Sequence, residues 1–193
     1  MQFAFDIETL GIESNSIVLS AAIIYFDLDE RPTLKELIDR ALFVKFDAVE
    51  QKKAGRSITP STLTWWKEQH EYIRKLSFAP RDDDYSMVDG INELRKYVKK
   101  YGTGKSDMMW ARGGLDQMAI ESLARTAGVE SFHDYNAWMD IRTALRCLKG
   151  NCNDRGYVNL PNTIMESYEI TKHHPVHDSA LDIMMILHGE WLD

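Results

Sequence analysis

The chain has 193 residues, of which 44% are hydrophobic and 27% charged, so it can bury one substantial core and is not expected to be disordered. Its formal charge of −7 excludes a general electrostatic coat for nucleic acid, although carboxylates that hold metal ions can still face phosphates. No apolar run is long enough to cross a bilayer, and no basic and then apolar leader precedes the first predicted strand. We therefore expect a cytoplasmic protein with no membrane partner.

Four stretches are expected to be strands. Residues 2–6 are short and apolar, residues 16–28 are long and rich in β-branched and aromatic side chains, and residues 42–46 alternate. The short links between these three stretches predict an antiparallel meander. A fourth strand is predicted at residues 108–112, where an apolar run ends at two glycines.

Helices are expected between and after these strands. Pro60, behind a potential N-cap at Thr59, opens a helix that we expect to run to about residue 76. The other helices are expected at residues 87–101, at 115–127, within 138–148 and from near 176 to about 191, with 151–174 as a long loop. This order predicts an α/β fold, with a mixed sheet and helices packed on it, in one domain spanning residues 1–193.

The stretch DIETLG ends the first predicted strand with two carboxylates. Because side chains on a strand alternate, Asp6 and Glu8 project from the same face. A lone pattern of this kind is more often a solvated strand end than a catalytic pair. Two like charges held side by side are nevertheless best accommodated by a divalent cation, so the pair is a candidate metal site.

A second carboxylate, Asp116, lies in the first turn of the helix that follows residues 108–112. An acidic residue there complements the helix dipole, which is a sufficient structural reason for it. The same place is the carboxyl end of a sheet strand, where open α/β folds build their sites. Asp116 is therefore a candidate only together with the other carboxylates.

The stretch HHPVHDSALD, near the C-terminus, places a histidine five residues before an aspartate in two registers. Asp182 lies among apolar neighbours inside the last predicted helix, where it needs a partner. We prefer His177 with Asp182, because Pro175 should precede the helix start and Asp178 then becomes a first-turn charge. The other register pairs His173 with Asp178.

In this order the three motifs resemble those of the DnaQ-like, or DEDD, 3'-5' exonuclease superfamily, in its histidine-bearing DEDDh branch. DIETLG fits the first motif, GGLD the second and HDSALD the third, and together they frame residues 6–182. Two places depart from the pattern: Gly113 and Leu115 stand where the second motif often has Asn and Phe, and Ile183 stands where a small residue often follows the last aspartate. The stretch TLTWW is similar to small relatives that include phage exonuclease A and bacterial exoribonucleases.

The resemblance implies a ribonuclease H-like mixed sheet, a three-stranded antiparallel meander plus parallel strands, flanked by helices. It implies a metal-dependent 3'-5' exonuclease that releases nucleoside 5'-monophosphates from the free 3' end of single-stranded RNA or DNA. Asp6, Glu8 and Asp182 would bind two divalent cations, Mg2+ or Mn2+, with Asp6 bridging them and Asp116 completing the site. His177 would act as the general base. A phage-encoded protein of this kind would work in the host cytoplasm.

Six residues are candidates for holding the nucleic acid. In the family, the stretch of Thr9, Leu10 and Gly11 contacts the terminal nucleotide, although core packing is an equal alternative for Leu10.

The other three candidates lie elsewhere in the chain. Trp65 and Trp66 are adjacent on a helix and are not expected to be both fully buried in one core, so one of them can stack on a base. One core tryptophan beside a half-buried one is the equal structural alternative. Arg112, beside the predicted site, is a candidate for a phosphate contact.

Two other functions stay open. A structure-selective endonuclease or a ribonuclease H on a related scaffold would use the same metal chemistry. A catalytically inert module that only binds nucleic acid would be supported by a missing carboxylate, and none is missing here. The sequence allows a homodimer without indicating an interface for one, and it does not choose between RNA and DNA.

Overall fold

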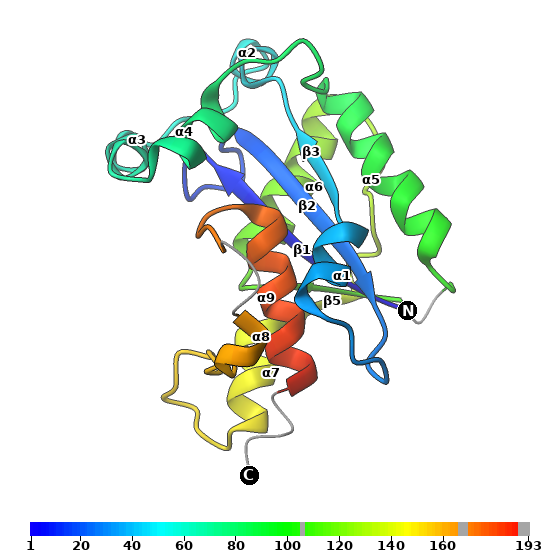
Figure 1. Ribbon diagram of the computed structural model, residues 1–193. Helices are drawn as coiled ribbons and strands as arrows, with labels where there is room; N and C mark the ends of the chain where they lie inside the picture. Colours follow the sequence, from blue (N-terminus) through cyan, green and yellow to red (C-terminus); the bar gives the residue numbers. More distant parts are fainter. Residues whose placement is uncertain (105–106, 166–169, 189–193) are drawn as a thin grey trace.

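A computed structural model describes residues 1–104, 107–165 and 170–188, and a five-stranded mixed sheet forms its centre (Figure 1). The sheet order is β3-β2-β1-β4-β5, with β1 at Gln2–Thr9, β2 at Val18–Phe26, β3 at Leu42–Lys45, β4 at Met108–Ala111 and β5 at Trp138–Asp140. β2 pairs antiparallel with both β1 and β3, whereas β4 pairs parallel with both β1 and β5. The predicted meander and parallel strands are therefore confirmed.

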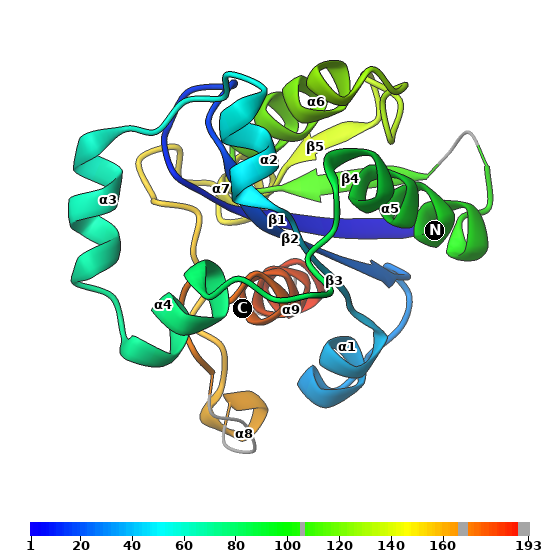
Figure 2. The ribbon, with the colours of Figure 1, turned by 90° about the horizontal axis from the view of Figure 1, so that it is seen from above.

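Helices cover both faces of the sheet, which Figure 2 shows edge-on between them. One face carries α5 (Met87–Tyr101) and α6 (Leu115–Ala127). The opposite face carries α9 (Pro175–His188), α1 (Leu34–Arg40) and α7 (Ile141–Leu148). The remaining helices are α2 (Ala48–Lys53), α3 (Pro60–Lys67) and α4 (Glu71–Phe78), near the end of β1, and α8 (Asn162–Met165), in the connection before α9 (Figure 1).

The central strand β1 sends alternate side chains into two different cores. Phe3 and Phe5 pack in the core that α5 and α6 cover, whereas Ala4 packs in the core that α9 covers. Because side chains on a strand alternate, Asp6 and Glu8 continue the face of Ala4. Both carboxylates therefore project toward the layer that contains α9.

The two helices predicted with the clearest apolar periodicity are confirmed at residues 87–101 and 115–127. The single helix predicted from Pro60 is instead two helices, because the chain breaks at His70, whose side chain accepts a hydrogen bond from the backbone N–H of Tyr72. The break lets Trp66 of α3 and Ile73 of α4 pack in the same buried cluster.

Two helices lie in segments to which the sequence analysis assigned no element. α1 begins behind Thr33, whose side chain accepts from the backbone of Glu36 while the Glu36 carboxylate accepts from the backbone of Thr33. α2 begins behind Asp47, whose side chain accepts hydrogen bonds from the backbone N–H groups of Val49 and Glu50. Both helices are too short to show an apolar period, so only their caps could have revealed them.

The C-terminal part agrees with the expected order of elements. The predicted loop at residues 151–174 contains only the four-residue α8 among its described residues. α9 begins at Pro175, and the part of the predicted helix beyond residue 188 lies outside the described residues. In the described parts of the chain, every helix is too short or too polar to span a membrane.

Candidate active site

Three elements far apart in the chain bring five carboxylates together near the carboxyl end of β1. β1 contributes Asp6 and Glu8, α6 contributes Asp116 from its first turn, and α9 contributes Asp178 and Asp182. Burial raises the pKa of Asp6, and the charges of the other four carboxylates raise it further. These five side chains, called the carboxylate cluster below, therefore act on one another as a unit.

Each member of the cluster holds its proton more tightly than a free carboxyl group does. Burial raises the pKa of Glu8, and Asp178 and Asp116 raise it further. Burial raises the pKa of Asp116 to about 7, against an opposing hydrogen bond with the backbone of Ile7. Burial also raises the pKa of Asp178 to about 6. Like charges held away from water in this way favour a divalent cation, and carboxylate oxygens are the ligands that hard cations prefer.

The tightest part of the site joins β1 to the start of α9. Among the described residues, one group of histidine, cysteine and acidic side chains has ligand atoms all within 4.8 Å of one another: Glu8, His173 and Asp178. This group could hold a metal ion. It was not the one that the sequence analysis preferred.

His173 is held in an uncommon backbone conformation. Its φ of 63° makes it the one non-glycine residue with positive φ in the described part of the chain. Its backbone N–H donates to Asp178 Oδ2 at 3.0 Å, and its ring meets the edge of Trp65 at 4.7 Å between centroids. Strained residues of this kind persist where the surroundings determine them, which is common at functional sites.

The preferred pair, His177 and Asp182, is engaged differently. His177 accepts the backbone N–H of Thr171 at Nδ1, at 3.0 Å, and stacks on the ring of His174 at 4.3 Å. Asp182 belongs to the carboxylate cluster, but its carboxylate is paired with Arg112. The structure therefore brings Asp6, Glu8, Asp116 and Asp182 together as expected, and it places a different histidine beside them.

A sequence signal for the other register was present. Ser179, a small residue, directly follows Asp178, whereas the larger Ile183 follows Asp182. The position of Pro175 favours the register of Asp182 in the sequence, because a proline is expected to precede the helix. In the structure Pro175 is the first residue of α9, Asp178 lies in the first turn as expected, and His173 lies just ahead of the helix.

Arg112 is bound within the protein at the end of β4. Its guanidinium forms an ion pair with Asp182, donates to the backbone oxygen of Gly156 at 2.8 Å and lies over the ring of Tyr157 at 4.4 Å. A phosphate contact, as predicted from the sequence, would have to compete with these partners. Arg112 therefore joins the site as the cation that faces Asp182.

The residues after the first carboxylate pair are fixed by packing. Leu10 is buried in the cluster that also contains Trp66, so the core alternative describes it. A Cβ atom on Gly11 would lie 2.4 Å from Ser16 Oγ and 2.5 Å from Thr59 Oγ1, so close approach within the protein already requires glycine there. Thr9 Oγ1 donates to the Gly11 backbone oxygen at 2.6 Å.

The two adjacent tryptophans have different surroundings. Trp66 is 2% exposed, and its Nε1 donates to the backbone oxygen of Thr9 at 2.9 Å, so it supports the end of β1. Trp65 is 38% exposed, and its ring meets His173. One core tryptophan and one partly exposed tryptophan were the structural alternative, and Trp65 is the one that a ligand can reach.

Comparisons with known proteins identify the family of this chain. Residues 1–188 match the family model of the Rv2179c-like 3'-5' exoribonuclease domain. The chain is also similar to an exodeoxyribonuclease of Enterobacteria phage T4, with 30% identity over 201 aligned residues that cover 95% of this chain and 86% of the relative. The mixed sheet flanked by helices is consistent with a ribonuclease H-like fold. The chain therefore belongs to the Rv2179c-like family of 3'-5' exoribonuclease domains and is an exonuclease that acts on nucleic acid.

Proposed function

We propose that the protein is a metal-dependent exonuclease that removes nucleoside 5'-monophosphates from the free 3' end of single-stranded nucleic acid. The observation that carries this proposal is the carboxylate cluster, with His173 against two of its members, Glu8 and Asp178. The matching family model is named for RNA and the phage relative for DNA, so both sugars belong in the test.

We assign metal binding to Asp6, Glu8, Asp116 and Asp178, with Asp182 in place of Asp178 as the alternative. This donor set is all oxygen and suits Mg2+ or Mn2+ better than softer metals. When bound, two such ions would stabilise the attacking and leaving oxygens and the charge that develops between them.

We assign the role of general base to His173. A base must lie within hydrogen-bond reach of the attacking water, and a group between two carboxylates of the metal site meets this condition. The hydrogen bond from the His173 backbone to Asp178 holds the backbone in place, and the contact with Trp65 restricts how the His173 ring can turn. His177 is the competing base, but its Nδ1 accepts the N–H of Thr171, so the neutral ring carries its proton on Nε2 and would have to give up this bond to accept a proton.

Single-stranded RNA and DNA of one sequence, labelled at the 5' end, test the proposal with Mg2+ and with Mn2+. We expect a ladder that shortens one nucleotide at a time from the 3' end, with nucleoside 5'-monophosphates as products. A circular single strand of the same sequence should stay intact. Cleavage of the circle would indicate an endonuclease instead, and undiminished activity in EDTA would rule out the metal-dependent reaction.

A further inference from the structure

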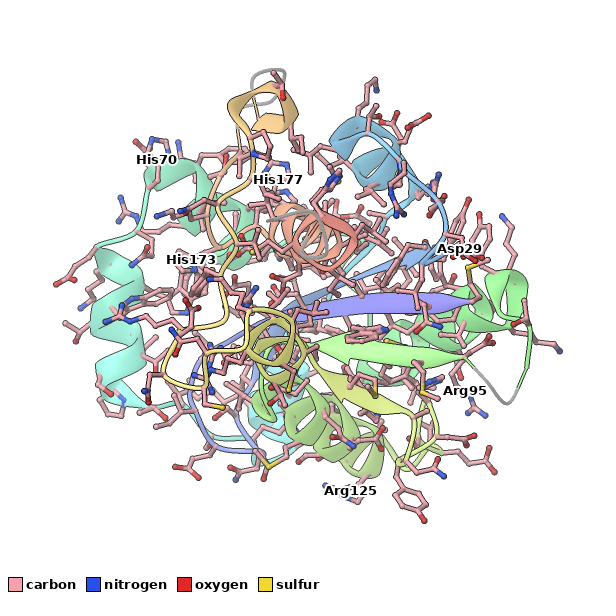
Figure 3. The ribbon with its side chains drawn as sticks, turned by 90° about the horizontal axis from the view of Figure 1, so that it is seen from below. Asp29, His70, Arg95, Arg125, His173 and His177 are labelled. Atoms are coloured by element: carbon pink, nitrogen blue, oxygen red, sulfur yellow. The ribbon has the colours of Figure 1, made fainter. Side chains whose placement is uncertain are left out.

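A pocket lies beside the carboxylate cluster, between the start of α4 and the segment that leads into α9. Its volume is about 470 Å³, and His70, Tyr72, Thr171 and His177 line it. This volume falls within the range of about 300–1,000 Å³ that is usual for ligand sites. Figure 3 shows His70 and His177 coming from two separate elements at the same end of the molecule.

The pocket shares the first turn of α9 with the active site. His177 lines the pocket, and the next residue, Asp178, belongs to the carboxylate cluster. Because His177 and Asp178 are consecutive in this turn, a ligand in the pocket lies within about one helical turn of a member of the cluster. That position suits a part of the substrate better than an unrelated molecule.

The chemistry of the lining excludes some ligands. The four described lining side chains are two imidazoles, one phenol and one hydroxyl, and none carries a fixed positive charge that would form an ion pair with a phosphate. The two histidines are also not part of a metal-binding group among the described residues.

The same lining suits a flat, polar ring. Tyr72 is 52% exposed, so a ring surface is accessible for stacking. His70 accepts the N–H of Tyr72 at Nδ1, and His177 accepts the N–H of Thr171 at Nδ1. In the neutral imidazole the proton is then on Nε2, so each ring offers one N–H donor from its other nitrogen.

We propose that this pocket binds a nucleobase of the substrate strand next to the reacting phosphodiester. The base stacks on Tyr72, and its carbonyl oxygens or ring nitrogens accept hydrogen bonds from His70 and His177. Single-stranded nucleic acid is recognised in this way because its unpaired bases expose both their faces and their edges. The inference rests on the proposed function and adds a contact that holds the strand by a base.

The test combines a change in the protein with a change in the substrate. Tyr72→Ala removes the stacking surface, and a single abasic nucleotide, placed in turn at each of the three positions nearest the 3' end, removes the base. We expect Tyr72→Ala to raise KM for an intact single strand by about 5- to 100-fold, the range of one lost stacking contact, with kcat little changed. An abasic nucleotide at one of these positions should raise KM for the wild-type protein and add little in Tyr72→Ala.

Two variants serve as controls. Tyr72→Phe keeps the ring and should keep the wild-type KM, so an equal loss in both variants would contradict stacking. Tyr135→Ala removes another tyrosine, which is 84% exposed and remote in sequence from the pocket, and should leave KM unchanged. Thermal melts of all three variants verify that they fold.

The outcomes separate this inference from the proposed function. If the wild-type protein shortens the intact strand, but neither Tyr72→Ala nor any abasic position raises KM, the pocket does not hold a base and the exonuclease assignment stands. If the wild-type protein shortens neither RNA nor DNA, both proposals are wrong.

Discussion

Buried charge is arranged in opposite ways at two places in this molecule. In the carboxylate cluster, like charges lie together, and the pKa of Asp6 is raised by burial and further by four neighbours of the same sign. At the edge of the sheet, the buried Lys45 is paired with Asp84 at 2.6 Å and also donates to the backbone oxygen of Ala79 at 2.9 Å. Pairing allows a buried charge to be tolerated by the fold, whereas gathered like charges oppose folding.

The difference indicates which buried charges serve the fold and which serve chemistry. The buried charge of Lys45 is neutralised by a side chain of the protein itself. The carboxylate cluster has more buried negative charges than nearby cations, so we expect it to bind another cation. The ion pair of Arg112 and Asp182 stands between the two cases, because Asp182 is within the cluster and has its own cation. Four predictions test this comparison.

The largest effect is expected from Asp6→Asn, which removes one charge from the cluster at nearly constant shape. Exonuclease activity should fall by about 10³-fold or more, as when one member of a group that acts as a unit is lost. The thermal midpoint in EDTA should rise at the same time, because repulsion within the folded protein is relieved. Rates on a labelled strand and melting curves measure the two effects. Asp83→Asn, at an exposed acidic residue, is the matched control and should change neither.

Substitution of each histidine decides between the two registers. His173→Ala should lower kcat by about 10²- to 10⁴-fold, the usual contribution of a general base. His177→Ala should act mainly on KM, because His177 lines the pocket beside the cluster. Single-turnover rates at saturating substrate separate the two. If His177→Ala instead gave the large loss in kcat, the pair of His177 and Asp182 would be the catalytic one.

Lys45→Met tests the paired region. It removes the nearer cation of the largely buried Asp84 and leaves only the guanidinium of Arg81, at 3.7 Å, so the free energy of unfolding should fall by about 3 kcal/mol. Activity per folded molecule should stay at the wild-type level, because the pair is structural. Urea unfolding gives the first quantity. The double variant Lys45→Met with Asp84→Leu should recover much of the loss, and failure to recover would show that the pair does not act as a unit.

The smallest effect is expected in the pH dependence of stability without metal. Burial raises the pKa of Asp116 to about 7 and that of Asp178 to about 6 in the folded protein, from an ordinary value of 3.8. The folded state therefore binds these protons more tightly, and the stability that they contribute is lost progressively as pH rises from the ordinary value to the raised one. Melts in EDTA should show the midpoint falling by a few degrees between pH 5 and pH 8, since ~1 kcal/mol shifts it by about 2–4 °C in a domain of this size. Mn2+ should reverse the fall, and a midpoint that rises over this range would contradict the cluster.

The features that could be predicted from the sequence are those that follow from local periodicity. The strand pattern places Asp6 and Glu8 on one face of β1, and the helical pattern predicts α5 and α6 with their bounds. The resemblance of the acidic motifs to the DEDD exonucleases also implied that Asp116 and Asp182 meet this pair. These inferences hold because side-chain direction along a strand or helix is set by backbone geometry.

The three-dimensional structure was needed to show which of two neighbouring pairs of candidate residues lies beside Glu8. His173 and Asp178 have the same spacing as His177 and Asp182, and the two pairs differ by four residues, or about one helical turn, so they are locally equivalent. Contacts with Glu8 on one side and Arg112 on the other distinguish them, and these partners come from distant parts of the chain. The small Ser179 after Asp178 is a weak local signal for the first pair, and the rest of the choice depends on packing between elements.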